Sequence, residues 1–202
     1  GKKANIAIVP IVSSLKLAKI SEKLGASAIV IEGGNAGGHL GTDINSQKII
    51  KDIVNEINIP VIGAGDIVTP DNVERTFKLG VDGVQIGTRF LASKESDVNE
   101  VFKKLLIKAE KKDVITLMSS AGLPANALKT KFAELVIKKK APQPEKCNDC
   151  LKHCTKDFCI KEALQNARKG NLERGIFFTG KGVWKIKEIL SVKDIFKNII
   201  NY

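Results

Sequence analysis

Four short apolar runs, each followed by a helical segment, constrain the fold of this chain more than any other feature. The runs cover residues 6–12, 28–31, 60–64 and 83–86, and most of their residues are β-branched or small and apolar. Strands that are apolar throughout are buried on both faces, and strands that alternate with helices pair in parallel. We therefore predict an α/β fold built on a parallel sheet.

The segments between these runs carry the start and stop signals of helices. A capping serine or threonine, an early proline or a terminal glycine marks most of them, and Ser13 or Ser14 caps the first. The helices are predicted over residues 15–24, 46–57, 70–79 and 95–112.

The position of the glycine turns indicates which kind of parallel sheet is present. Open doubly wound sheets bind phosphate after the first strand, whereas (β/α)8 barrels use the loops after their last two strands. Here the best turns, residues 63–66 and 87–89, follow the third and fourth runs. We interpret the runs as strands 5–8, so that residues 1–112 form the C-terminal half of a TIM (β/α)8-type barrel.

The rest of the chain breaks this alternation. We expect residues 113–140 to cap the barrel, with an apolar run at 114–120 and a helix at 125–138. Residues 141–202 begin with a linker that contains two prolines. They are predicted to form a mainly helical C-terminal segment, which carries all four cysteines.

Both glycine turns have the chemistry of a phosphate site. Glycines between a strand and a helix let backbone N–H groups converge on an anion in front of the helix N-terminus. Gly65 and Gly87 provide such turns, and Thr88 adds a hydroxyl donor. Asp66 is an exception, because its carboxylate suits a phosphate site only if the side chain points away. Arg89 can either add charge or brace the barrel through an ion pair.

A second glycine-rich segment, residues 32–43, follows the second run. Its five glycines do not suit the interior of a helix or strand, and they fit a loop that lies against a flat ligand. His39 is one of only two histidines and stands at the end of a barrel strand, where catalytic residues gather. An imidazole can exchange a proton near neutral pH, so we predict a catalytic role for His39.

At this point the motifs resemble a known family. AGGHLG, GAGDI and GVQIGTRFLAS, in this order, and the later stretch SSAGLPANALKTKF resemble the nitronate monooxygenases, once called 2-nitropropane dioxygenases. The closely similar flavin-dependent enoyl-acyl-carrier-protein reductases are part of the same resemblance. The matched motifs cover most of residues 6–132.

This resemblance implies an FMN-dependent oxidoreductase that acts on a small molecule. The phosphate would bind at Gly65, Asp66, Gly87 and Thr88, with the flavin edge near Gly37 and Gly38. The implied cofactor-binding residues are Glu32, Gly37, Gly38, Ala64, Gly65, Asp66, Gln85, Gly87 and Thr88. His39 would be the catalytic base toward nitroalkanes, whereas nitronates arrive deprotonated and are oxidised through flavin and oxygen. In the reductases, NAD(P)H reduces the flavin, which passes hydride to an enoyl thioester.

The chain departs from the family pattern in several places. The family commonly has Glu at Asn35, Gly at Asp66 and Arg at Asn126, and its first strands have no counterpart here. A half-barrel exposes two sheet edges. We therefore expect a homo-oligomer, association with a missing N-terminal half, or an inactive fragment. Two alternatives to a flavin-dependent oxidoreductase are open. One is a sugar-phosphate isomerase or synthase without flavin, and the other is a degenerate half-barrel with an interaction or structural role.

The cysteines form a separate cluster, Cys147, Cys150, Cys154 and Cys159. Four thiols within thirteen residues can surround one ion such as zinc, although the spacing matches neither a zinc ribbon nor a ferredoxin. The alternatives are reduced packing and redox-sensitive thiols. Since we see no export signal, we expect no structural disulfides.

The net charge is +11, from 33 basic and 22 acidic residues. The lysines are spread over helical patterns, and one Trp and one Tyr offer few stacking platforms, so we expect no nucleic-acid partner. No apolar run is long enough for a membrane span, and we expect a cytoplasmic protein without a membrane partner.

Overall fold

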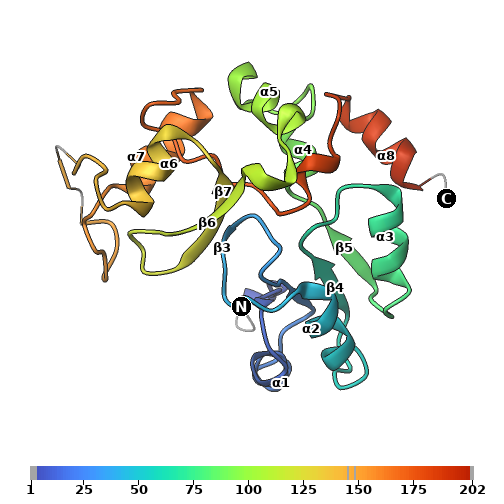
Figure 1. The fold of residues 1–202 in the computed structure, drawn as a ribbon. Coiled ribbons are helices and arrows are strands. Elements are labelled where there is room, and N and C mark those ends of the chain that lie inside the picture. Colours follow the sequence, from blue (N-terminus) through green and yellow to red (C-terminus); the bar gives the residue numbers. More distant parts are fainter. Residues whose placement is uncertain (1–3, 145, 148, 201–202) are drawn as a thin grey trace.

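The computed structural model describes residues 4–144, 146–147 and 149–200. It contains a four-stranded parallel sheet in the order β1-β2-β4-β5. Figure 1 shows β4 and β5 of this sheet side by side. The strands are β1 (Ile11–Val12), β2 (Ile29–Ile31), β4 (Val61–Ala64) and β5 (Gly83–Gln85). The predicted α/β fold with a parallel sheet is therefore confirmed. The described strands form an open sheet and do not close a barrel.

Three helices follow the strands of this sheet, and the first and third have the predicted caps. They are α1 (Leu15–Lys23), α2 (Ser46–Ile53) and α3 (Pro70–Phe77). Ser14 accepts a hydrogen bond from the N–H of Leu17 at the start of α1, and Thr69 forms a capping box with Asn72 at the start of α3. Such caps satisfy backbone donors that a helix leaves free at its first turn.

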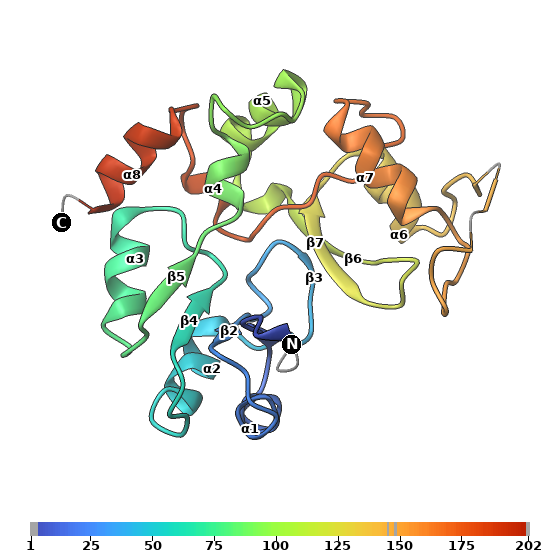
Figure 2. The same cartoon turned by 180° about the vertical axis from the view of Figure 1, so that it is seen from behind.

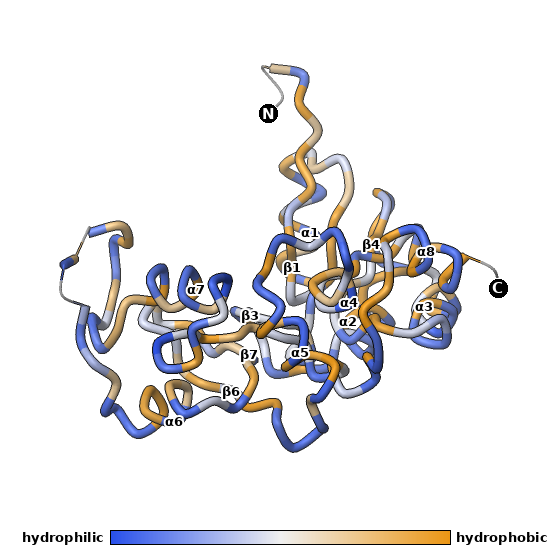
Figure 3. Tube along the Cα trace, turned by 90° about the horizontal axis from the view of Figure 1, so that it is seen from above, coloured by the Kyte–Doolittle hydropathy of each residue, from blue (hydrophilic) through white to orange (hydrophobic). Residues whose placement is uncertain are grey.

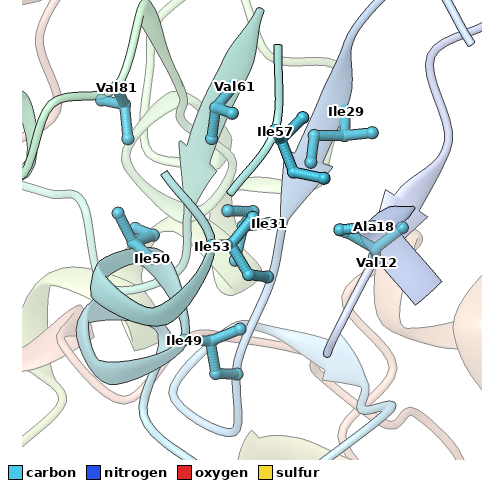
Figure 4. Close-up of a cluster of buried hydrophobic side chains, with 10 residues drawn as sticks. All are labelled: Val12, Ala18, Ile29, Ile31, Ile49, Ile50, Ile53, Ile57, Val61 and Val81. Carbon is cyan, nitrogen blue, oxygen red and sulfur yellow. The ribbon is translucent and has the colours of Figure 1, made fainter. Parts of the chain in front are cut away.

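A core of isoleucine and valine side chains holds α2 against the sheet. Ile49, Ile50 and Ile53 of α2 face Ile31 of β2 and Val61 of β4 in Figure 4, and all are buried. Burying an aliphatic side chain of this size contributes about 1.5–3 kcal/mol. The period of the apolar residues in α2 therefore fixes which face of the helix meets the sheet.

The first run is much less buried than we predicted. Only Ile11 and Val12 of residues 6–12 form a strand, and Ile6 and Ile11 are 65% and 59% exposed. In Figure 3 the segment before β1 projects from the body of the molecule in the hydrophobic colour. The physical reason is that β1 is an edge strand, paired with β2 on one side only.

A second, antiparallel sheet in the order β3-β7-β6 corrects two predictions. Its strands are β3 (Gly38–His39), β7 (Pro124–Leu128) and β6 (Val114–Met118). The predicted helix at 125–138 is wrong in its first part, because Ala125, Asn126 and Ala127 pair with β6 across a hairpin. The glycine-rich loop also contains a short strand, since Gly38 pairs with Asn126.

The remaining helices surround these two sheets. They are α4 (Thr88–Leu91), α5 (Glu100–Lys108), α6 (Lys131–Ile137), α7 (Ile160–Arg168) and α8 (Val192–Ile200), with short 3-10 helices at Lys111–Asp113 and Val183–Lys185. Figure 2 shows α8 beside α3, so the end of the chain returns to the parallel sheet. No helix of the described residues has the length and apolar character needed to cross a membrane.

Candidate active site

A cavity of about 330 Å³ lies at the carboxyl ends of β2, β4 and β5. Ligands of parallel α/β sheets bind at this edge, because the loops after the strands converge there. All nine residues that we predicted to bind the cofactor line this cavity. Its complete lining is Glu32, Ala36, Gly37, Gly38, Ala64, Gly65, Asp66, Ile67, Val68, Gln85, Gly87, Thr88, Leu91, Phe178, Thr179 and Gly180.

The two glycine turns differ in what a side chain would meet. At Gly65 it would strain the backbone, whereas at Gly87 it would enter open space. Gly65 has φ +92°, which L residues rarely adopt, and an added Cβ would lie 3.4 Å from the backbone nitrogen of Ala36. At Gly87 an added Cβ would meet nothing within 4 Å, so the space over this turn is open. The turns therefore leave bare backbone beside the cavity.

The Asp66 carboxylate is engaged by a lysine from the C-terminal part of the chain. Lys185 Nζ lies 3.2 Å from Asp66 Oδ2, and Asp66 Oδ1 is directed at Gly182. Oδ1 is buried and has no hydrogen-bond partner among the described residues. The Asp66 backbone is left-handed, with φ 56°. The lysine offsets the negative charge that sequence analysis identified as a difficulty for phosphate binding.

Residues 178–180 form a wall of the cavity that sequence analysis missed. The N–H of Gly180 donates to Thr88 Oγ1 at 3.0 Å. An added Cβ on Gly37 would lie 2.8 Å from the Gly180 nitrogen, so the two backbones approach closely. Phe178 and Thr179 precede this contact and also line the cavity. Their only sequence signal is a turn-rich composition, because they belong to no β/α unit.

Asn126 fastens the glycine-rich loop to the second sheet. Its side chain is fully buried and its Nδ2 donates to the carbonyl oxygens of Gly34 at 3.0 Å and Ala36 at 2.7 Å. Thr116 Oγ1 donates to Asn126 Oδ1 at 2.7 Å. Asn35 serves the same loop, since its Oδ1 accepts from the N–H of Ser46. The two departures from the family pattern at 35 and 126 are thus satisfied polar contacts.

His39 stands beside the cavity and contacts a serine of the β6–β7 turn. His39 Nε2 lies 2.8 Å from Ser119 Oγ, and no other hydrogen bond to the ring is present among the described residues. Its neighbour Gly38 lines the cavity, and Phe178 packs edge-on against the imidazole at 5.2 Å. Burial lowers the pKa of His39 below its ordinary 6.5, because the charged ring loses solvation. The ring is therefore held neutral near pH 7.

Glu32 is the one acidic residue of the cavity lining whose pKa is shifted by burial. It follows β2 and lines the cavity, and its carboxyl group has no hydrogen-bond partner among the described residues. Burial raises the pKa of its carboxyl above 4.5. A half-buried carboxyl without a protein partner is available to a hydroxyl or N–H group of a ligand.

Arg89 braces the fold and does not line the cavity. Only 6% of this residue is exposed. Its guanidinium donates to the backbone carbonyl oxygens of Glu188 and Ala92 at 3.0 and 3.1 Å. Of the two roles that the sequence left open for Arg89, the structure shows bracing, through carbonyl oxygens.

The predicted zinc site is not supported. The four cysteines are free and line one small cavity. Within residues 4–144, 146–147 and 149–200, however, no three His, Cys, Asp or Glu side chains are grouped so that they could hold a metal ion. Short spacing brings the thiols near one cavity without directing them at one point.

Comparison with known proteins agrees with the resemblance in the motifs. The family described as nitronate monooxygenase matches residues 1–201. A probable nitronate monooxygenase of Staphylococcus aureus is 32% identical over 142 residues, which are 66% of this chain and 40% of that protein.

Two solved structures have the same fold. FabK from Thermotoga maritima is 34% identical with a TM-score of 0.87, over 99% of this chain and 61% of that chain. A nitroalkane oxidase from Streptomyces ansochromogenes is 22% identical with a TM-score of 0.79, over 99% of this chain and 58% of that chain. The chain thus spans less than two thirds of the length of each relative.

Proposed function

Because the chain belongs to the nitronate monooxygenase family, we propose that it carries the FMN phosphate site and the catalytic histidine of a flavin-dependent oxidoreductase. One observation carries this proposal. Two glycine turns on neighbouring parallel strands border the same cavity as the glycine-rich loop that precedes His39.

The residues present at the cavity fit FMN. Gly65 and Gly87 both line the cavity, and at Gly87 the backbone lies next to open space, which a phosphate group requires. Thr88 Oγ1 accepts from Gly180, so its own hydroxyl hydrogen is available to a phosphate oxygen. Glu32 and Gln85 line the same cavity and would offer a carboxyl and an amide group to polar groups of the cofactor. When bound, FMN supplies the capacity to accept an electron pair from a substrate and to pass it on.

His39 acts in this proposal as a base through Nδ1. His39 Nε2 lies 2.8 Å from Ser119 Oγ. In the tautomer that this proposal requires, Nε2 carries the hydrogen and donates it to Ser119 Oγ, so the lone pair is on Nδ1. A neutral nitroalkane must lose a proton from carbon before it is oxidised, whereas a nitronate has already lost it. His39 is therefore required for nitroalkanes and much less for nitronates.

Oxygen uptake tests the nitronate assignment. We expect the chain with FMN, supplied with an alkyl nitronate, to consume oxygen. His39→Gln should keep flavin and lose nitroalkane turnover more than nitronate turnover. Equal loss on both substrates would contradict the role of His39 as a base, and flavin binding without oxygen uptake on either would contradict the nitronate assignment.

Enoyl thioester reduction is a second candidate function. It is favoured by the similarity to FabK, which at 34% identity extends over 99% of this chain. The discriminating measurement is NAD(P)H consumption with a crotonyl thioester. Consumption that depends on the thioester, together with no oxygen uptake on nitronates, would select the reductase.

We also propose that the parallel sheet is the C-terminal half of an eight-stranded barrel. Both of its outer strands, β1 and β5, pair on one side only. Beside β5, an apolar cavity of about 520 Å³ opens between α3 and α8, and beside β1 the side chains of Ile6 and Ile11 are exposed. Pairing with a second copy, or with four preceding β/α units, would cover both edges.

A further inference from the structure

The four cysteines surround one small cavity away from the flavin site. Cys147 and Cys150 are exposed, whereas Cys154 and Cys159 are half-buried. The cavity measures about 40 Å³, and two lysines, Lys156 and Lys161, share its lining. The catalytic role proposed above uses none of these residues.

Ser120 also lines this cavity and connects it to the β6–β7 turn. Ser120 is 1% exposed, and its Oγ is buried without a hydrogen-bond partner among the described residues. Its carbonyl oxygen accepts from the N–H of Thr155 at 2.9 Å. Since Thr155 follows Cys154 directly, a backbone hydrogen bond anchors this cysteine to the turn.

The preceding residue of the turn holds the catalytic histidine. Ser119 Oγ lies 2.8 Å from His39 Nε2, and it also accepts from the N–H of Ala121 at 3.2 Å. Ser119 is 1% exposed. A continuous path therefore runs from Cys154 through Thr155, Ser120 and Ser119 to the imidazole. Ser120 thus faces the cysteine cavity, and its buried neighbour Ser119 contacts His39 at the active site.

Exposure, one thiol contact and the backbone link to the β6–β7 turn select two of the four thiols as a candidate pair. Cys147 donates its thiol hydrogen to Asp149 at 3.5 Å, whereas Cys150 has no such partner among the described residues. Cys150 is exposed to an oxidant in solution, and Cys154 is the half-buried thiol next to the anchored Thr155. Exposed thiols oxidise first, and a neighbouring thiol then resolves the product.

We propose that hydrogen peroxide oxidises Cys150 and Cys154 to a disulfide. This disulfide alters the Ser119–His39 contact through residues 119–120 of the β6–β7 turn. Cys150 sulfur attacks hydrogen peroxide, which gives a sulfenic acid and one water. Cys154 sulfur then attacks that sulfenic acid, which forms the S–S bond and releases a second water. The two thiols lose two electrons, peroxide gains them, and a dithiol reductant reverses the change.

The test measures thiols and the His39 ring, and it needs neither flavin nor substrate. The full chain with His153→Gln keeps His39 as its one histidine, so its imidazole NMR signals are assigned without ambiguity. After hydrogen peroxide we expect the loss of two free thiols and a peptide that links Cys150 to Cys154. We also expect displaced His39 signals, and dithiothreitol should restore both the thiols and the signals.

Two matched variants decide the outcome. Cys154→Ser should abolish both the disulfide and the displacement of the His39 signals, whereas Cys147→Ser should retain both. Four free thiols after peroxide would overturn the proposal. So would a disulfide that leaves the His39 signals in place, or a Cys154→Ser variant that still responds. Because the readout is independent of FMN, these outcomes are distinct from a failure of the proposed enzymatic function.

Discussion

Gly65 and Gly80 adopt the same left-handed backbone, with φ +92° and +93°, but of the two only Gly65 lines the cavity proposed to bind FMN. A side chain in this conformation costs about 1–2 kcal/mol of folding free energy. We expect Gly65→Ala and Gly80→Ala to lower thermal stability to a similar extent. Only Gly65→Ala should also weaken FMN affinity, by about tenfold or more, because backbone donors would move away from the phosphate.

Gly80→Ala is the control for general destabilisation in this pair. Fluorescence titration with FMN at a temperature where both variants are folded gives the two affinities. Equal loss of FMN affinity in both variants would place the effect in the fold and not in the phosphate turn.

The lowered pKa of His39 has a direct consequence for the pH dependence of turnover. A base must be unprotonated, so activity on nitroalkanes is present above the His39 pKa and is lost as pH falls through it. Because burial moves this pKa below 6.5, we expect an acid limb centred below 6.5 in the profile of kcat/KM. A limb centred above 6.5, or a profile that His39→Gln leaves unchanged, would contradict this assignment.

Ser119 is a positioning residue in this account, because it fixes the tautomer of His39 without touching substrate. Ser119→Ala should lower nitroalkane turnover several-fold and shift the acid limb, while nitronate turnover stays near its original value. The comparison of the two substrates separates this role from a merely structural one. A uniform loss on both substrates would indicate that Ser119 only supports the fold.

Among the structural elements, β7 supports the site through Asn126. Asn126→Ala removes the partners of two buried carbonyl oxygens, those of Gly34 and Ala36, and should cost about 1–3 kcal/mol of unfolding free energy. Thr116→Val removes only one hydrogen bond to Asn126 and should cost less. Urea denaturation measures both. A Thr116→Val variant as unstable as Asn126→Ala would show that the hydrogen bonds from Asn126 to the carbonyl oxygens of Gly34 and Ala36 add no stability of their own.

The elements that sequence analysis predicted well are those with a strong local pattern. The helix after Thr69 and the strand ending at Ala64 have caps, a terminal glycine and apolar runs that determine their structure locally. Residues 125–128 were predicted as part of a helix, because alanine and leucine favour helices in isolation. Pairing with β6 and β3 overrides that preference, and such long-range pairing has no local signal.

The candidate site likewise contains some residues with a local sequence signal and others without one. Residues of β/α loops, such as Gly65 and Thr88, were predicted because glycine turns after strands are local features. Thr179 and Gly180 come from the far end of the chain and reach the cavity only through the tertiary fold, and Lys185 reaches Asp66 in the same way. Ser119 was likewise missed as a partner of His39, because eighty positions separate the two residues.

For the molecule as a whole, we expect the two outer edges of the parallel sheet to govern association with other chains. Ile11 in β1 is 59% exposed, and Leu24 after α1 is 74% exposed but lies outside the sheet. An exposed apolar edge strand promotes pairing with another chain, and a lysine on the edge opposes it. We expect the chain to self-associate in sedimentation velocity, Ile11→Lys to reduce association, and Leu24→Lys to leave it unchanged. A stable monomer that binds FMN tightly would contradict the half-barrel interpretation.

The proposed function requires that the two glycine turns bind the phosphate of FMN. Calorimetric titration of the chain with FMN and with riboflavin, which differ only in that phosphate, tests it most directly. We predict saturation at one FMN per chain. The affinity for riboflavin should be lower than that for FMN by about tenfold or more, because charge-assisted hydrogen bonds contribute about 1.5–3 kcal/mol. Equal affinity for the two ligands, or no binding of FMN, would contradict the account.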